Sequence, residues 1–234
     1  MNFIKKYVRK VTIKMFNLFG FSIYKNVPDA AGFTGASKIL EFNYGHLESK
    51  KTRTSINLQK KPFPWFTYPA IEYLDQLDLS KKTMLEWGSG NSSLFFSERV
   101  QALTSLEHNS EWFEKVKEFG IPNQSLILAT DDYATCAELD GKLFDIILID
   151  GIKREECAQI GPSLLAKGGL IILDNSDRYP EIACKLRMKG YIEIDFHGFG
   201  PINDYTWTTS LFLDREIALE PKSIQPTIPI GGGF

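Results

Sequence analysis

Polar side chains follow two strongly apolar runs of the sequence, FDIILI at 144–149 and GLIIL at 169–173. Asp150 comes directly after the first run, and Asp174 and Asn175 come directly after the second. If the two runs are neighbouring parallel strands, about 4.8 Å apart, these side chains meet at one edge of a sheet. Two carboxylates and an amide oxygen form an all-oxygen set that suits Mg²⁺ or Ca²⁺. The same oxygens can instead accept hydrogen bonds from loop amides or from a substrate.

A lysine lies close to the first of these acids. Lys153 follows Asp150 by three residues, within the same predicted loop. A lysine whose pKa is lowered by its surroundings can act as a general base. The alternative is a solvated residue at the start of the helix that follows.

A glycine loop follows an earlier apolar run, in the sequence LEWGSGNSS. Gly88, Ser89 and Gly90 suit a tight turn between a strand and a helix, where backbone amides approach a ligand closely. Ser93 stands where a dinucleotide-binding fingerprint has Gly or Ala, so the NAD pattern is incomplete. Glu86 precedes the loop, and its carboxylate would repel a pyrophosphate but could hold a cationic amino acid.

Acidic residues also follow the next two predicted strands. Glu107, with His108 beside it in SLEHN, lies where an acid accepts both hydroxyls of a bound ribose. Asp131 and Asp132 follow the third strand in LATDDY, where a carboxylate can reach an adenine amine. S-adenosylmethionine carries a sulfonium and an ammonium but no phosphate, so it suits Glu86 as well. A bound NAD also predicts Glu107, which therefore does not distinguish the two cofactors.

These residues are connected by a regular alternation of strands and helices. Strands are predicted at 83–87, 103–107, 125–129, 144–149, 169–173, 191–196 and 207–213. Helices are predicted at 91–100, 110–119, 153–166 and 178–189, and another begins at about residue 69. The alternation predicts an α/β fold, a Rossmann-like doubly wound sheet with helices on both faces. Only the loop GFGPINDY separates the last two strands, so the last strand is predicted to be reversed.

In these features the chain resembles the class I S-adenosylmethionine-dependent methyltransferases over about residues 65–213. The resemblance rests on EWGSG as the cofactor loop, Glu107 as the ribose acid, FDIILIDG as the fourth strand and the final strand–loop–strand. It implies a seven-stranded sheet and a bound S-adenosylmethionine. The implied cofactor-binding residues are Glu86, Gly88, Ser89, Gly90, Glu107, His108, Asp131, Asp132 and Asp150.

The pattern at the later strand ends is similar to that of the metal-dependent, catechol-type O-methyltransferases. In that family an Asp after the fourth strand and an Asp-Asn pair after the fifth bind magnesium, and a lysine is the catalytic base. Asp150, Asp174, Asn175 and Lys153 match this spacing. The resemblance implies Asp150 and Lys153 as catalytic residues, with Mg²⁺ or another divalent cation lowering the pKa of an acceptor hydroxyl.

The leading hypothesis is therefore O-methylation of a small molecule or glycan, with or without a divalent metal. An NAD-dependent oxidoreductase and a non-catalytic, membrane-associated scaffold with the same fold are the alternatives. The net charge of −2 argues against a nucleic-acid partner. Three cysteines without paired spacing indicate a reducing compartment, so we expect a cytoplasmic protein. Expected domains are a basic helix and cap segment (1–62), the methyltransferase domain (63–214) and a Pro/Gly-rich tail (215–234).

The first 20 residues carry five cations and no acid. Their apolar residues Ile4, Val8, Val11, Met15 and Leu18 recur at helical spacing. The segment therefore predicts a basic amphipathic helix, which either packs on the body of the protein or lies on an anionic membrane surface. The second alternative would make the cytoplasmic protein peripheral on a membrane. An organellar targeting peptide is a third alternative.

Overall fold

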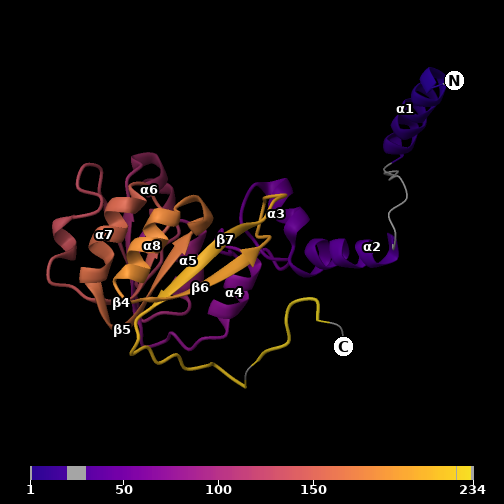
Figure 1. Ribbon diagram of the computed structural model, residues 1–234. Helices are drawn as coiled ribbons and strands as arrows, with labels where there is room; N and C mark the ends of the chain where they lie inside the picture. Colours follow the sequence, from indigo (N-terminus) through magenta and orange to yellow (C-terminus); the bar gives the residue numbers. More distant parts are fainter. Residues whose placement is uncertain (1, 20–29, 225, 233–234) are drawn as a thin grey trace. The chain divides into compact units, whose positions relative to one another are not determined.

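The structure is a computed structural model that describes residues 2–19, 30–224 and 226–232. The chain divides into two compact units, Met1–Lys38 and Ile39–Phe234. The second unit contains every strand of the described chain and the residues predicted for the site (Figure 1).

The first unit contains helices α1 (Asn2–Leu18) and α2 (Ala30–Lys38). Helix α1 confirms that the first residues form a helix. Val8, Val11 and Met15 on α1 each have more than half of their surface exposed. Within the described residues, every helix is too short or too polar to cross a bilayer.

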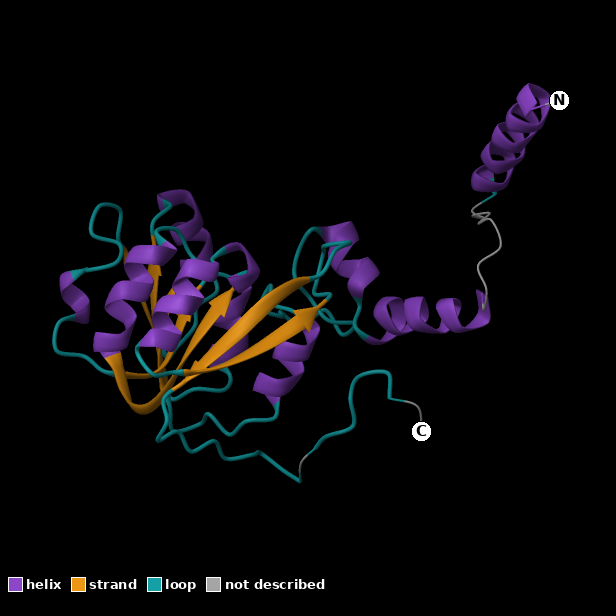
Figure 2. Cartoon of the chain, in the orientation of Figure 1, coloured by secondary structure: helices purple, strands orange, loops and turns teal. Residues whose placement is uncertain are grey.

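The second unit is built on a seven-stranded sheet with the order β3-β2-β1-β4-β5-β7-β6. Figures 1 and 2 show its strands as arrows with helices beside them. The strands are β1 (Thr83–Trp87), β2 (Ala102–Glu107), β3 (Gln124–Leu128), β4 (Phe144–Ile149), β5 (Leu165–Asp174), β6 (Ile192–Gly198) and β7 (Trp207–Leu213). The first five pair in parallel, whereas β7 runs antiparallel to both β5 and β6. The predicted α/β sheet with a reversed last strand is confirmed.

Helices cover both faces of the sheet. On one face the apolar core includes α4 (Tyr68–Asp75) and α5 (Asn91–Ser97). On the other it includes α7 (Arg154–Leu164) and α8 (Pro180–Met188). Helix α6 (Ser110–Lys117) packs against β2 and β3. Short 3₁₀ turns span Ala137–Leu139 and Ser176–Arg178.

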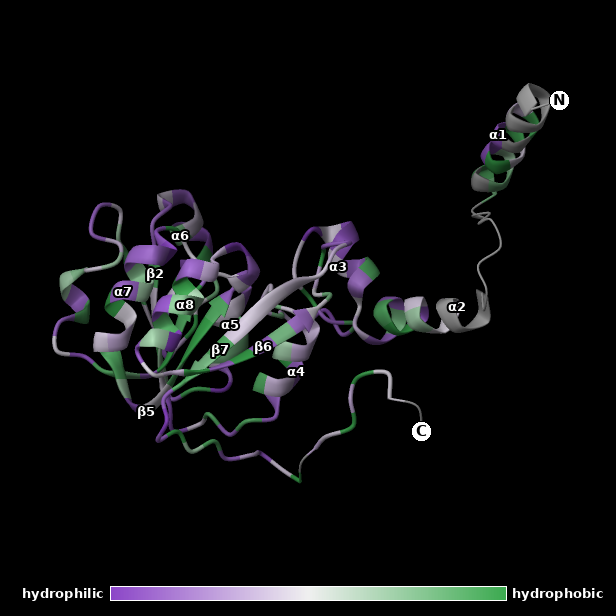
Figure 3. Cartoon of the chain, in the orientation of Figure 1, coloured by the Kyte–Doolittle hydropathy of each residue, from purple (hydrophilic) through white to green (hydrophobic). Residues whose placement is uncertain are grey.

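Burial on two faces explains why the middle strands are apolar throughout. In β4, Ile147 and Ile149 pack toward α7 and α8, whereas Ile146 and Leu148 pack toward α4 and α5. All four side chains are fully buried or nearly so. Alternation of polar and apolar residues is lost because neither face of a central parallel strand meets water. The central strands are accordingly coloured as hydrophobic in Figure 3.

The segments that precede α4 and follow β7 in the sequence pack against the sheet and its helices. The segment before α4 contains a π-helical turn at Ile39–Asn43 and helix α3 (His46–Thr52). After β7 the chain has neither helix nor strand in its described residues, and Asp78 N donates to Glu220 O at 2.7 Å. The domain boundaries predicted at residues 62 and 214 stay predictions.

Candidate active site

The glycine loop lies at the point where the strand order reverses. Strand β1 has β2 on one side and β4 on the other, so the loops after β1 and β4 adjoin at the carboxyl ends of the strands. Gly88 has φ +98°, and a Cβ there would lie 3.1 Å from the backbone of Gly151, in the loop after β4. Only glycine combines this conformation with so close an approach.

Glu86 supports the glycine loop from within the core. Its buried carboxyl group accepts hydrogen bonds from the hydroxyls of Ser92 at 3.0 Å, Ser93 and Ser105. Burial raises the pKa of Glu86 to about 7, against the opposing effect of these hydrogen bonds. Glu86 is fully buried and does not line the cavity beside the loop. The position therefore does not suit the direct cofactor contact that the sequence suggested for it.

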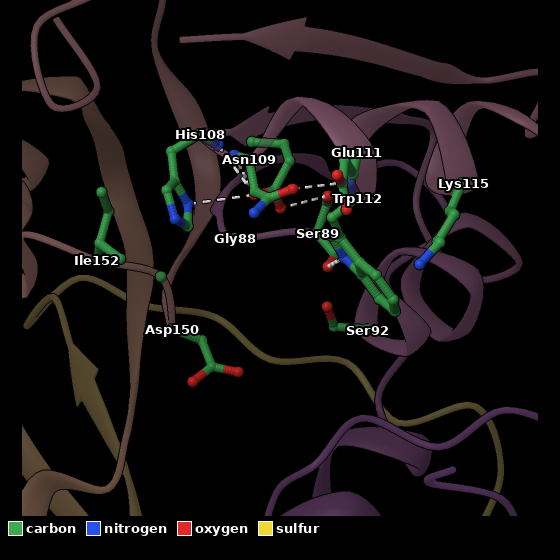
Figure 4. A pocket seen from close by; sticks show the side chains of 12 residues that line it. Gly88, Ser89, Ser92, His108, Asn109, Glu111, Trp112, Lys115, Asp150 and Ile152 are labelled. Atoms are coloured by element: carbon green, nitrogen blue, oxygen red, sulfur yellow. Dashed lines mark hydrogen bonds and ion pairs between the residues drawn. The ribbon is translucent and has the colours of Figure 1, made fainter. Parts of the chain in front are cut away.

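Glu107 is a buried acid that lines a cavity of about 580 Å³ beside the glycine loop. Figure 4 shows this cavity with Ser89, His108 and Asp150 around it. Its carboxylate accepts hydrogen bonds from Ser89 Oγ and from the backbone N–H groups of His108 and Asn109, each at 2.9 Å. His108 Nδ1 lies 3.1 Å from Glu107 Oε1. Five of the predicted cofactor residues thus line one cavity: Gly88, Ser89, Glu107, His108 and Asp150.

Trp112 also lines this cavity, and sequence reasoning did not identify it. Its Nε1 donates to the main-chain oxygen of Ser89 at 2.8 Å, which ties helix α6 to the glycine loop. Asn109 Oδ1 accepts the backbone N–H of Trp112 at 2.9 Å and so caps α6. An Asn directly before the amphipathic run SEWFEKVK is an N-cap signal, and the helix begins at residue 110 as the sequence predicted.

Other predicted residues, besides Glu86, lie outside the cavity. Gly90 instead lines the third cavity, described below. Asp131 and Asp132, expected near the adenine, are exposed and do not line the 580 Å³ cavity. Lys153, expected as the catalytic base, donates from Nζ to the main-chain oxygen of Asp131 at 3.1 Å. Its ammonium therefore bonds to the loop after β3, and Lys153 lines neither this cavity nor the one beside Asp174. The geometry does not support Lys153 as the base.

A second cavity of about 350 Å³ lies at the ends of β4 and β5. The structure brings together Asp150, Asp174 and Asn175 here, as the sequence predicted. Residues from distant segments complete the lining: Trp65, Arg154, Arg178, Asn203 and Tyr205.

The two carboxyl groups of this cavity lie in an environment that disfavours their charged forms. Burial raises the pKa of both Asp150 and Asp174. The negative charge of Asp150 raises the pKa of Asp174 further, whereas Arg154 opposes the shift at Asp150. Asp174 Oδ1 accepts hydrogen bonds from Trp207 Nε1 at 3.1 Å and from Thr209 Oγ1 at 2.6 Å.

The oxygens predicted to bind a metal do not fit one. Arg154 donates to the Asp150 carboxylate at 2.7 Å and to Asn175 Oδ1 at 3.3 Å, so a guanidinium occupies the space between them. Asp174 Oδ1 is already bonded to Trp207 and Thr209. In the part of the chain that the structure describes, no group of three His, Cys, Asp or Glu side chains could hold a metal ion.

A third cavity of about 250 Å³ extends from the glycine loop toward the segment before α4. Arg53 and Trp65 line it together with Ser89 and Asn91. Asn91 Nδ2 donates to the main-chain oxygen of Ser55 at 2.6 Å, which fastens this segment to the loop. Asp150 borders all three cavities and therefore lies at their junction.

Comparisons with known proteins find similarity in fold but not in sequence. No family model and no curated protein matches the chain by sequence. Among solved structures, the chain is similar to a precorrin-6y C5,15-methyltransferase from Geobacter metallireducens, with 18% identity and a TM-score of 0.51 over 70% of this chain and 96% of that one. A methyltransferase from Pyrococcus furiosus matches with 15% identity and a TM-score of 0.49 over 79% of this chain and 100% of that one.

Proposed function

We propose that this protein is an S-adenosylmethionine-dependent methyltransferase. The observation that carries the proposal is the buried carboxylate of Glu107, facing a cavity beside Gly88 where the strand order reverses. The similarity of fold to the Geobacter methyltransferase supports it.

The charges of the cavity suit this cofactor better than a dinucleotide. Three acids line the 580 Å³ cavity, Glu107, Glu111 and Asp150. Lys115 is the lysine among its lining residues. Acidic walls repel a pyrophosphate, whereas they favour a ligand that carries positive charge. The cavity therefore fits S-adenosylmethionine and disfavours NAD.

Each part of the site has a separate task in the proposed reaction. When bound, S-adenosylmethionine supplies a methyl group on a sulfonium, which is a strong electrophile. Glu107 would accept the ribose hydroxyls, while Gly88 allows the backbone to approach the ligand closely. Asp150, at the junction of the cavities, would accept a hydrogen bond from the acceptor and so orient its nucleophile.

The acceptor is proposed to be the oxygen of a small molecule or glycan. The 350 Å³ cavity has a size typical of small-molecule sites. Trp65 and Tyr205 line it with about half of their surface exposed, which gives a sugar or aromatic ring two flat surfaces to contact.

Calorimetric titration of the full chain with S-adenosylmethionine, S-adenosylhomocysteine and NAD⁺ tests the proposal. We expect saturable binding of the first two and none of NAD⁺. Binding of NAD⁺ alone would favour an oxidoreductase, and no binding of any of the three would favour a scaffold. Transfer of labelled methyl groups from S-adenosylmethionine into small-molecule or glycan extracts then tests the acceptor, and label in nucleic acid would contradict it.

We further propose that α1 attaches this enzyme to an anionic membrane surface. Lys10 and Lys14 are exposed on the helix, as are the apolar side chains of Val8, Val11 and Met15. A helix with these two kinds of side chain can lie in the membrane interface. Flotation with phosphatidylserine vesicles should recover the full chain but not a Val8→Asp/Met15→Asp variant. Recovery of both would contradict the proposal, and phosphatidylcholine vesicles test the need for negative charge.

A further inference from the structure

The guanidinium of Arg154 joins the ends of β4 and β5. Nη2 donates to Asp150 twice, to its main-chain oxygen at 3.0 Å and to Oδ1 at 2.7 Å. Nη1 donates to the main-chain oxygen of Asp174 and to Asn175 Oδ1, and Nε donates to the main-chain oxygen of Gly151 at 3.0 Å. The Arg154 side chain is only 12% exposed. Five oxygens from two strand ends thus converge on one largely buried cation.

We infer that Arg154 is a built-in cation that takes the place of a divalent metal and positions Asp150 and Asn175 for the acceptor. The role toward an acceptor rests on the proposed methyltransferase function. The claim that Arg154 excludes a metal does not rest on that function, because it follows from the contacts of Arg154 alone.

The backbone at both strand ends is shaped for this arrangement. Lys153 has φ +49° and Asn175 has φ +55°, in the left-handed region that side chains other than glycine rarely adopt. Arg154 follows the turn at Lys153 and begins α7, and its guanidinium bonds toward β5. Lys153 itself bonds to Asp131 instead. The turn therefore selects which of two adjacent cations enters the site.

A guanidinium and a divalent ion cannot share these oxygens. Arginine stays protonated at any physiological pH, so its charge would repel a metal a few ångströms away. Arg154 already uses Asp150 Oδ1 and Asn175 Oδ1, and Trp207 and Thr209 already use Asp174 Oδ1. Mg²⁺ or Ca²⁺ can take water as well as protein oxygens, but an ion here would have to bind beside the guanidinium, through the carboxylate oxygens that Arg154, Trp207 and Thr209 leave over.

The arrangement also restricts the acceptor. A metal would bind a pair of adjacent hydroxyl oxygens directly and lower their pKa. Asp150 and Asp174 instead offer carboxyl oxygens to the cavity, with Asp150 held in place by Arg154. These carboxyl oxygens suit an acceptor whose nucleophilic hydroxyl donates a single hydrogen bond. A diol that could chelate a metal would bind no better than a single hydroxyl.

Manganese binding tests this inference without knowledge of the acceptor. The wild-type chain, Arg154→Ala and Arg154→Ala/Asp150→Asn are titrated with Mn²⁺, and the free ion is measured by electron paramagnetic resonance. We expect no stoichiometric binding by the wild type, because Arg154 fills the site. Arg154→Ala should bind one Mn²⁺ per chain, and the added loss of the Asp150 charge should abolish this. Arg178→Ala, which removes an arginine from the same cavity, should behave as the wild type.

Two measurements keep the inference separate from folding and from the proposed function. S-adenosylhomocysteine binding by each variant reports an intact cofactor cavity, and its absence in the wild type would count against the proposed function alone. If Arg154→Ala is poorly folded, Mn²⁺ should raise its melting temperature and leave that of the wild type unchanged. Stoichiometric Mn²⁺ binding by the wild type, or none by Arg154→Ala by both titration and melting, overturns the inference.

Discussion

Two regions along the carboxyl edge of one sheet form the site, and they are built differently. We call them the cofactor edge, at the ends of β1 and β2, and the acceptor edge, at the ends of β4 and β5, after their proposed ligands. At the ends of β1 and β2, Glu107 is held by the next two residues, His108 and Asn109, and by Ser89, 18 positions earlier in the glycine loop. At the ends of β4 and β5, Asp174 is held by residues more than thirty positions away, Trp207 and Thr209. The first edge can be interpreted from local sequence, whereas the second depends on the assembled sheet.

This difference has a consequence for charge. At the cofactor edge an acid faces the cavity with its negative charge available to a ligand. At the acceptor edge the acids are partly neutralised inside the protein, because Arg154 pairs with Asp150 and burial favours the protonated form of Asp174. The cofactor edge is therefore expected to bind a cation, and the acceptor edge a neutral donor of hydrogen bonds.

Replacement of Glu107 by alanine should have the largest effect. The change removes a charged acceptor from Ser89 Oγ and two backbone N–H groups as well as from the ligand. We expect a loss of about 3 kcal/mol, or roughly 100-fold weaker binding of S-adenosylhomocysteine by calorimetry. Glu111→Ala, in the same cavity but exposed, should change the affinity only a few-fold. If the two changes weakened binding equally, the prediction that Glu107 contacts the ligand directly would be wrong.

The pH dependence of stability should come in part from Glu86. Burial raises its folded-state pKa to about 7 from an ordinary value of 4.5, so the folded protein holds this proton more tightly. The resulting stabilisation is complete below the unfolded-state pKa and is lost as the pH rises through about 7. Between about pH 5 and 8, the wild type should lose on the order of 2–3 kcal/mol more than Glu86→Gln. Urea unfolding at several pH values measures this difference, and parallel curves would contradict it.

The fold could be predicted because it depends on patterns that repeat along the chain. Apolar runs such as residues 144–149 must be buried on both faces, and helical stretches between them leave few alternatives to a parallel sheet. The positions of Gly88 and Glu107 could be predicted for a similar reason. A glycine in a tight turn and an acid at a strand end are each placed by the strand that directly precedes them. Each of these signals lies within a few residues of the structure it specifies.

The acceptor edge could be predicted only in part. The sequence correctly placed Asp150, Asp174 and Asn175 at one cavity. It assigned a role to Lys153 and did not consider Arg154, because the left-handed backbone turn at Lys153 that decides between the two is a feature of the folded chain. Neither could it reveal that Asp174 is already bonded to Trp207. A divalent metal and an arginine side chain bind the same kinds of oxygen. The presence of these oxygens in the sequence therefore did not show which of the two occupies the site.

Trp207→Phe tests the long-range support of the acceptor edge. The change keeps most of the buried ring but removes the Nε1 donor to Asp174 Oδ1, while Thr209 Oγ1 remains. We expect about 1–2 kcal/mol lower free energy of unfolding in urea, because a buried acceptor loses one of its two partners. Tyr205→Phe removes an exposed hydroxyl 3.3 Å from Arg178 and should cost less than about 0.5 kcal/mol. A smaller effect at Trp207 than at Tyr205 would show that Asp174 does not depend on this contact.

The smallest expected effect on ligand binding concerns the methionine end of the cofactor, which would lie in the third cavity. Arg53 lines the third cavity with Ser89 and Asn91, and it forms no ion pair with any residue of the described chain. Its charge is therefore available to the carboxylate of the methionine part of the cofactor.

Arg53→Ala should weaken S-adenosylhomocysteine binding about tenfold, since one charge-assisted contact is worth about 1.4 kcal/mol. Methylthioadenosine has the same nucleoside but no carboxylate, so its affinity should not change. Lys51→Ala removes an exposed cation from the same segment outside the cavity and should affect neither ligand. If Arg53→Ala weakens both ligands equally, the segment before α4 shapes the cavity but does not bind the carboxylate. The cofactor edge would then share the acceptor edge's dependence on distant segments, because residues outside the sheet would be holding the glycine loop in place.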